Sequence, residues 1–139
     1  MTGVCFGWDA VALADLRDLN RHRTGSKFVA WQARGFYGAK DQAPDEAQLE
    51  DLITKGEELT LRAAKAQEEK GGVYWFLLGA QFPFQHTTTA DKFIYEAELR
   101  TGVGAHYRYA KHLRDVLELW YQNFPSTRGL ILEGSAEPE

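Results

Sequence analysis

The sequence has one cysteine, no excess of positive charge and no long hydrophobic run, and each absence excludes a class of protein. A lone cysteine, Cys5, cannot form an internal disulfide framework or a cysteine pair for a metal. A net charge of −4 gives no domain-wide attraction for nucleic acid. The apolar run over 73–84 is too short to span a bilayer and contains Gln81 and Pro83. No signal peptide is visible, so we expect a cytoplasmic protein that does not enter a membrane.

Residues that favour helices dominate the apolar part of the chain. There are 17 alanines and 15 leucines, against six valines and three isoleucines. Alanine and leucine favour helices, whereas strands draw on β-branched residues. The composition therefore predicts a mainly α protein, a compact bundle of about five to six helices in a single domain over 1–134. Residues 135–139 are expected to form an acidic C-terminal end.

The clearest element is a helix expected over 45–70, which follows Pro44 and ends at two glycines, 71 and 72. Apolar or small residues recur in it at alternating spacings of three and four, which is the heptad pattern of a helix that packs along another helix. If these residues pack within the monomer, Leu52→Ala or Leu59→Ala would lower stability by about 2–4 kcal/mol. We call this set the heptad face, a candidate protein interface: Leu49, Leu52, Gly56, Leu59, Ala63 and Ala66.

The remaining elements are less sharply defined. Asp9 is a suitable N-cap for a first helix that would run to about residue 23. The 26–38 segment suits a short helix, with a strand as the alternative. Over 73–100 an apolar run precedes residues that favour a helix, which Thr88 or Thr89 would cap; a short β-hairpin is the alternative there. The 103–124 segment is an amphipathic helix that ends before Pro125.

Two histidines are candidates for a polar site. His86 follows the aromatic run and precedes three threonines, and an imidazole beside a hydroxyl can act as a base–nucleophile pair. No carboxylate that would orient His86 is identifiable, and a polar turn explains the threonines equally well. We therefore expect His86→Ala to preserve function and to affect stability little. His106 lies on the apolar side of the expected 103–124 helix, where a histidine is usually a core or interface group.

Basic residues gather in two places. Arg108, Lys111 and Arg114 fall on consecutive turns of one helix and are a candidate nucleic-acid contact, although Asp115 and Glu118 on the same face would repel phosphates. The sequence Arg21-His22-Arg23 closes the first expected helix, where cations complement the helix dipole.

No reaction motif, metal-ligand spacing or phosphate-binding glycine loop is present, so we expect no cofactor and no metal. The sequence favours a non-enzymatic helical interaction protein: a subunit, adaptor or inhibitor within a larger macromolecular complex, bound to a protein partner or to its own copies. One alternative is a small subunit of a nucleoprotein complex that contacts nucleic acid through the 103–124 helix. Another is a small enzyme or ligand binder that uses His86 and an aromatic pocket. In size and helix layout the chain resembles the small all-helical subunits of CRISPR effector complexes and compact phage-encoded helical proteins.

Overall fold

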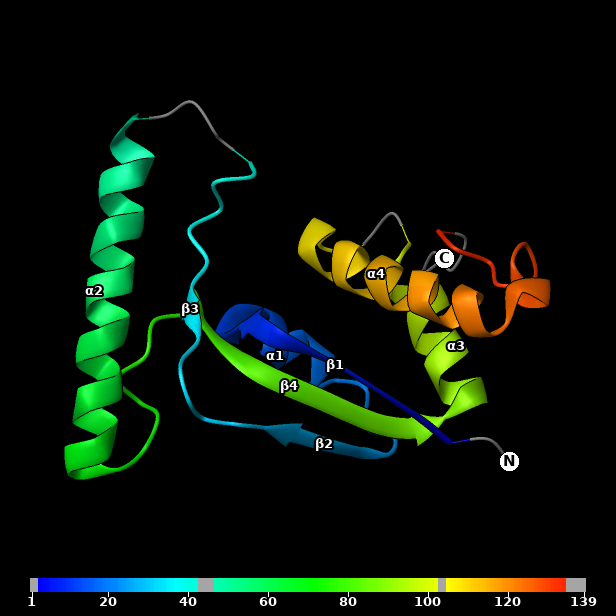
Figure 1. Ribbon diagram of the computed structural model, residues 1–139, viewed down its shortest axis with the longest axis horizontal. Coiled ribbons are helices and arrows are strands. Elements are labelled where there is room, and N and C mark those ends of the chain that lie inside the picture. Colours follow the sequence, from blue (N-terminus) through cyan, green and yellow to red (C-terminus); the bar gives the residue numbers. More distant parts are fainter. Residues whose placement is uncertain (1–2, 43–46, 103–104, 135–139) are drawn as a thin grey trace. The chain divides into compact units, whose positions relative to one another are not determined.

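The computed structural model describes residues 3–42, 47–102 and 105–134. Over these residues the fold is mixed α/β, with 49% helix, 21% strand and an antiparallel sheet of four strands (Figure 1). The predicted helical bundle is therefore wrong, and the likeness to all-helical subunits fails with it. None of the described helices is both long and apolar enough to cross a membrane.

The strand β4 (Ala80–Thr89) is the centre of the sheet. It lies between β1 (Gly3–Ala12) and β2 (Ser26–Val29), and its first residues pair with the two-residue strand β3 (Gly35–Phe36). The described helices are α1 (Leu13–Leu19), α2 (Ala47–Lys70), α3 (Ala90–Arg100) and α4 (Tyr107–Asn123), followed by a short 3-10 turn, η1 (Pro125–Thr127).

The strand β1 occupies residues that were expected to begin a helix. Positions 4, 6, 8, 10 and 12 are buried or half-buried, whereas Cys5, Gly7 and Asp9 between them are exposed. A period of two places alternate side chains on opposite faces, as a strand requires. This alternation outweighs the alanine- and leucine-rich composition, and Asp9 is therefore not a helix cap.

The strand β4 replaces the β-hairpin that was the alternative over 73–100. It pairs with β1, β2 and β3, and the residues after it form α3, so the favoured helix is confirmed and the hairpin is wrong. Thr89 stands at the N-cap position of α3. Proline is unusual in a central strand because it has no N–H to donate. Here the carbonyl of Pro83 accepts a hydrogen bond from the Ala30 amide at 3.2 Å.

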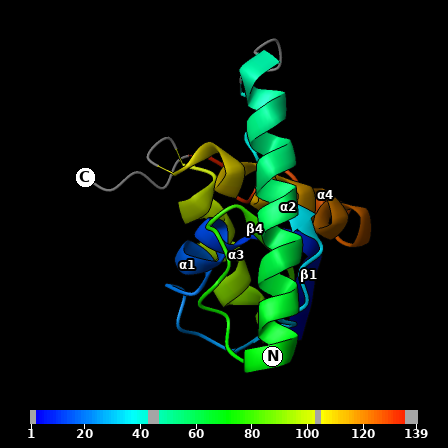
Figure 2. The same ribbon diagram turned by 90° about the vertical axis from the view of Figure 1, so that its left-hand side faces the viewer.

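The two long helices are confirmed. Helix α2 has 24 residues and α4 has 17, and they are the longest described helices, as predicted from periodicity. Figure 2 shows α2 as a regular, straight helix over its full length. In the 26–38 segment, the strand alternative is the one that forms, as β2 and β3.

The chain divides into two compact units, and β1 and β4 contribute residues to both. One, here the α3–α4 unit, comprises Met1–Phe6, His22–Ser26 and His86–Glu139. Its core includes Phe93, whose ring centroid lies 5.1 Å from that of Phe6 and 5.3 Å from that of Trp120.

The other, here the α1–α2 unit, comprises Gly7–Arg21 and Lys27–Gln85. Phe82 is fully buried in it, with its ring centroid 4.9 Å from that of Phe76 and 5.2 Å from that of Trp31. The single domain expected over 1–134 stays a prediction.

Candidate functional site

The sequence Arg21-His22-Arg23 lies in the connection between α1 and β2. Helix α1 ends at Leu19, so these residues do not form the helical last turn in which they were expected. Arg23 is exposed and His22 is half-buried. Residues 22–26, which we call the basic loop, belong to the α3–α4 unit.

A hydrogen bond joins the basic loop to the end of α3. The Nε of Arg100 donates to Nε2 of His22 at 2.7 Å, across 78 residues of sequence. A guanidinium can only donate, so Nε2 of His22 carries the lone pair and the imidazole is neutral in this contact. The guanidinium carbon of Arg100 also lies 5.5 Å from the ring centroid of the buried Tyr109. These two contacts fix the plane of the guanidinium.

Arg100 is half-buried, so part of its surface faces solvent. Within the part of the chain that the structure describes, its two terminal nitrogens make no hydrogen bond or ion pair. The side chain of Arg23, which follows His22 in the chain, likewise makes no hydrogen bond or ion pair with the described residues. A fixed guanidinium with two unoccupied terminal nitrogens is suited to bidentate binding of a phosphate or carboxylate.

The buried side of the basic loop is held by His86. Its Nε2 donates to the carbonyl oxygen of Thr24 at 2.7 Å, and its Nδ1 lies 3.3 Å from Oε2 of Glu96 on α3. Gly25 completes the turn with φ of +70°, and a Cβ at this position would overlap the carbonyl oxygen of Thr87. The loop conformation is therefore set from the interior.

The two histidines predicted for a polar site have different surroundings. His86 is completely buried, so in this structure it supports a loop and does not face solvent. His106 is exposed at the N-cap position of α4, and its ring centroid lies 4.6 Å from that of Tyr107. It does not lie on the apolar side of the helix. His112, also on α4, is buried.

The three residues of the candidate nucleic-acid contact all lie on α4. Lys111 forms an ion pair with Asp115 at 3.0 Å, and Nη2 of Arg114 donates weakly to the carbonyl of Thr101 at 3.5 Å. Arg108 is half-buried. The charge of Lys111 is thus offset by one of the two acidic residues that were expected to oppose phosphate binding.

The heptad face of α2 is only partly covered. Gly56 and Ala63 are buried, Leu49, Leu59 and Ala66 are half-buried, and Leu52 is 65% exposed. A Cβ at Gly56 would overlap the ring of Phe36, so this glycine allows β3 to approach the helix.

Sequence reasoning missed Arg100 as a site residue, together with its contact to His22. Nothing local in the sequence marks Arg100 as the partner of a residue 78 positions away. Among the described residues, no group of three or more His, Cys, Asp or Glu side chains is placed to hold a metal ion.

No protein-family model and no curated protein matches the chain. Its fold is similar to that of solved structures of thymidylate synthase X (ThyX) from Helicobacter pylori. Two such structures contain FAD and dUMP, and the protein in one of them is a flavin-dependent thymidylate synthase. Each matches with a TM-score of 0.59 and 13% sequence identity, over 84% of this chain and 66% of the other. The chain thus spans slightly less than two thirds of these proteins, and the likeness is one of fold.

Proposed function

We propose that this protein binds a phosphorylated nucleotide at the basic loop. The observation that carries the proposal is the guanidinium of Arg100, which is oriented by His22 and Tyr109 while its terminal nitrogens are unoccupied among the described residues. A phosphate would accept two hydrogen bonds from these nitrogens, and the exposed Arg23 would add a second positive charge nearby in the chain.

The fold likeness supports a nucleotide as the ligand class. The two ThyX structures contain FAD and dUMP, and both of these molecules carry phosphate groups. A guanidinium held in a fixed orientation is well suited to bind phosphate. The sequence suggested, as one alternative, a ligand binder that uses His86. We keep the ligand binder and change the residue that contacts the ligand. His86 holds the loop, and Arg100 takes the place of His86 at the ligand.

Arg100, with Arg23 of the basic loop, offers donors suited to the phosphate part of FAD or dUMP. The two apolar hollows described along α2 belong to the α1–α2 unit and contain none of the loop residues. We assign no residue to the flavin ring, and we propose binding without proposing a reaction. The expectation that the protein is not an enzyme stays a prediction.

Calorimetric titration of the purified protein with dUMP and FAD tests the proposal, with deoxyuridine and riboflavin as matched ligands that lack phosphate. At least one phosphorylated ligand is expected to bind at least about tenfold more tightly than its phosphate-free counterpart, because charge-assisted hydrogen bonds contribute about 1.5–3 kcal/mol. Arg100→Ala should remove most of that difference. Arg100→Lys should restore only part of it, since an ammonium cannot bind bidentately.

The control variant is Arg128→Ala, which removes the same charge from an exposed arginine of the same unit that is hydrogen-bonded to Glu118 at 2.9 Å. It should leave nucleotide binding unchanged. Two results would refute the proposal: equal affinity for ligands with and without phosphate, or an Arg100→Ala variant that folds and binds like the wild type.

A further inference from the structure

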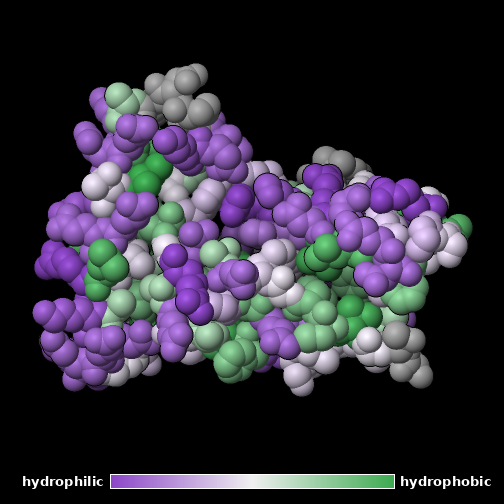
Figure 3. Space-filling view, in the orientation of Figure 1, coloured by the Kyte–Doolittle hydropathy of each residue, from purple (hydrophilic) through white to green (hydrophobic). Residues whose placement is uncertain are grey.

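Helix α2 carries an apolar line that its own unit leaves partly uncovered. Leu52, Leu59 and Ala66 are seven residues apart, so they lie along one line down the helix. Leu52 is 65% exposed, and the other two are half-buried. Figure 3 shows that the face of α2 turned to the viewer is mostly hydrophilic. We call these three residues the 52–59–66 line.

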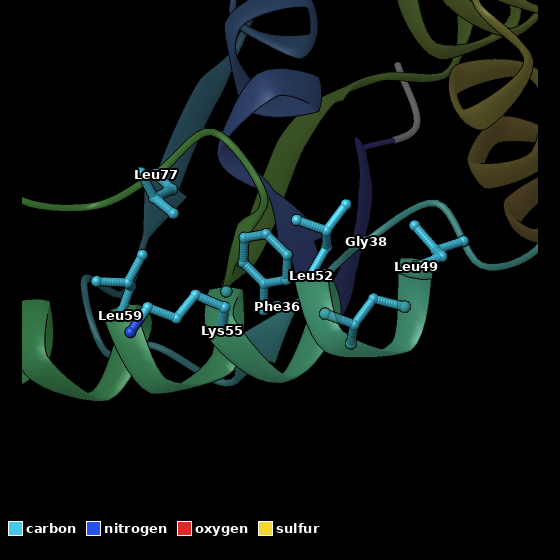
Figure 4. Close-up of a pocket in the computed structure, with 9 residues that line it drawn as sticks. Phe36, Gly38, Leu49, Leu52, Lys55, Leu59 and Leu77 are labelled. Carbon is cyan, nitrogen blue, oxygen red and sulfur yellow. The ribbon is translucent and has the colours of Figure 1, made fainter. Parts of the chain in front are cut away.

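Leu52 and Leu59 of this line form part of the wall of an apolar hollow (Figure 4), and Ala66 lines a second hollow beside it. Two hollows of about 370 Å³ and 260 Å³ lie along α2, and both are lined by Leu59 and Leu77. The first extends toward Leu49 and Leu52, and the second toward Ala66 and Trp75. Among the described residues, Lys55 is the charged residue that lines the larger hollow, and Arg62 lines the smaller one. We call the combined feature the α2 groove; it accommodates an apolar, elongated partner.

We propose that the α2 groove binds α2 of a second copy of this chain, with the two helices antiparallel about a two-fold axis near Leu59. The two end residues of the 52–59–66 line, Leu52 and Ala66, are each seven positions from the middle residue, Leu59. A two-fold axis there would place Leu59 against its own copy and Leu52 against the partner's Ala66. A large side chain would then face a small one at each end, which satisfies the requirement that a two-fold contact be complementary to itself.

The charges on α2 select the antiparallel orientation. Its first half, 47–58, has four carboxylates and one lysine, a net charge of −3. Its second half, 59–70, has three basic and two acidic residues, a net charge of +1. An antiparallel pair brings each acidic half against a basic half, whereas a parallel pair would bring the two acidic halves together. The α2 groove is thus complementary to α2 of a second copy in apolar character, in side-chain size and in charge.

This contact uses the α1–α2 unit and does not depend on nucleotide binding. It also gives the expected protein partner a specific form, namely a second copy. A different protein in the groove, or no partner, is the competing outcome.

Sedimentation of the full-length protein tests self-association. We expect a concentration-dependent species of about twice the monomer mass of 15.7 kDa, present by about 100 µM. Leu52→Asp should abolish it without changing the melting temperature, because Leu52 is largely exposed in the monomer. The matched control is Leu61→Asp. Leu61 is 73% exposed on the same helix but about 200° around from Leu59, so this variant should still associate.

Cysteine cross-linking tests the orientation in a Cys5→Ser background. Leu59→Cys should form a disulfide-linked dimer under mild oxidation, since an antiparallel pair brings the two copies of position 59 together. Leu52→Cys should cross-link with Ala66→Cys when the two proteins are mixed, and not with itself. A monomer at all concentrations would overturn the proposal. So would equal loss of association in Leu61→Asp, or efficient self-cross-linking of Leu52→Cys.

Discussion

The Nδ1 atom of His86 lies 3.3 Å from Oε2 of Glu96, and the two side chains are only 1% and 2% exposed. Because Nε2 of His86 donates to the Thr24 carbonyl, that nitrogen carries a proton. A hydrogen bond between Nδ1 and Oε2 requires one further proton, either on Nδ1, which gives an imidazolium beside a carboxylate, or on Glu96, which gives an acid beside a neutral imidazole. Both forms are neutral overall, which a buried site tolerates far better than an isolated charge.

Removing either partner alone should therefore destabilise the protein strongly. His86→Leu or Glu96→Leu leaves the other polar group buried without its partner, for which we expect a loss of about 3–5 kcal/mol in the free energy of unfolding. The double variant should lose much less than the sum of the two. Urea denaturation of the wild type, the two single variants and the double variant measures the coupling free energy between His86 and Glu96. This prediction reverses the sequence-based expectation that replacing His86 affects stability little, because that expectation placed His86 on a loop.

The exposed pair Lys111–Asp115, at 3.0 Å, provides the control cycle. Its single replacements by alanine should change stability by less than about 1 kcal/mol, since solvent screens exposed ion pairs. If the His86 and Glu96 variants are no more destabilised than these, the two groups do not form a buried pair.

At Gly56 we expect a glycine-to-alanine substitution to lower stability, although this substitution usually stabilises a helix. Replacing a glycine inside a helix by alanine normally stabilises a protein by about 0.5–1 kcal/mol. At Gly56 the added methyl group would overlap the ring of Phe36, so we expect Gly56→Ala to destabilise by about 1–3 kcal/mol. Thermal denaturation measures the change. In a Phe36→Leu background the same substitution should be tolerated better, whereas a Gly56→Ala protein that melts higher than the wild type would show that the helix does not approach β3 closely.

The helices could be predicted because their signals are local. Helices α2 and α4 follow from apolar spacings within each segment, and α3 follows from residues that favour helices after a capping threonine. The strand β1 also has a local signal, the alternation of its side chains, but Asp9 within it is equally suited to cap a helix. The sheet order was not accessible in this way, because β4 pairs with segments on both sides of α1, far from it in sequence.

The site depended on contacts that no local pattern encodes. His22 and Arg100 are both basic and lie 78 positions apart in the sequence. Only the fold places one against the other. The heptad face was correctly located on a helix, but its pattern cannot show how much of the face a neighbouring segment covers. Phe36 lies against Gly56, while Leu52 stays 65% exposed. Leu52→Ala should consequently have little effect on the monomer, contrary to the loss expected for a buried leucine.

Tyr121 gives a pH dependence that can be derived from its surroundings. Burial raises the pKa of its phenol above the ordinary value of 10.0, and the nearby carboxylate of Glu133, whose Oε2 accepts a hydrogen bond from the hydroxyl at 3.2 Å, raises that pKa further. The folded state therefore holds this proton more tightly than the unfolded chain. Its contribution to stability is fully present below about pH 10 and is lost as the pH rises through the folded pKa.

Wild type should therefore lose stability relative to Tyr121→Phe as the pH is raised above about 10, because phenylalanine has no proton to lose. Urea denaturation of both proteins across this range measures the difference, and Tyr95→Phe, at an exposed tyrosine, is the control expected to follow the wild type. Glu133→Gln should reduce the pH dependence without removing it, since burial is the larger cause of the raised pKa. Parallel stability curves for wild type and Tyr121→Phe would mean that the phenol titrates alike in the folded and unfolded chains, and that neither burial nor Glu133 acts on it as the structure indicates.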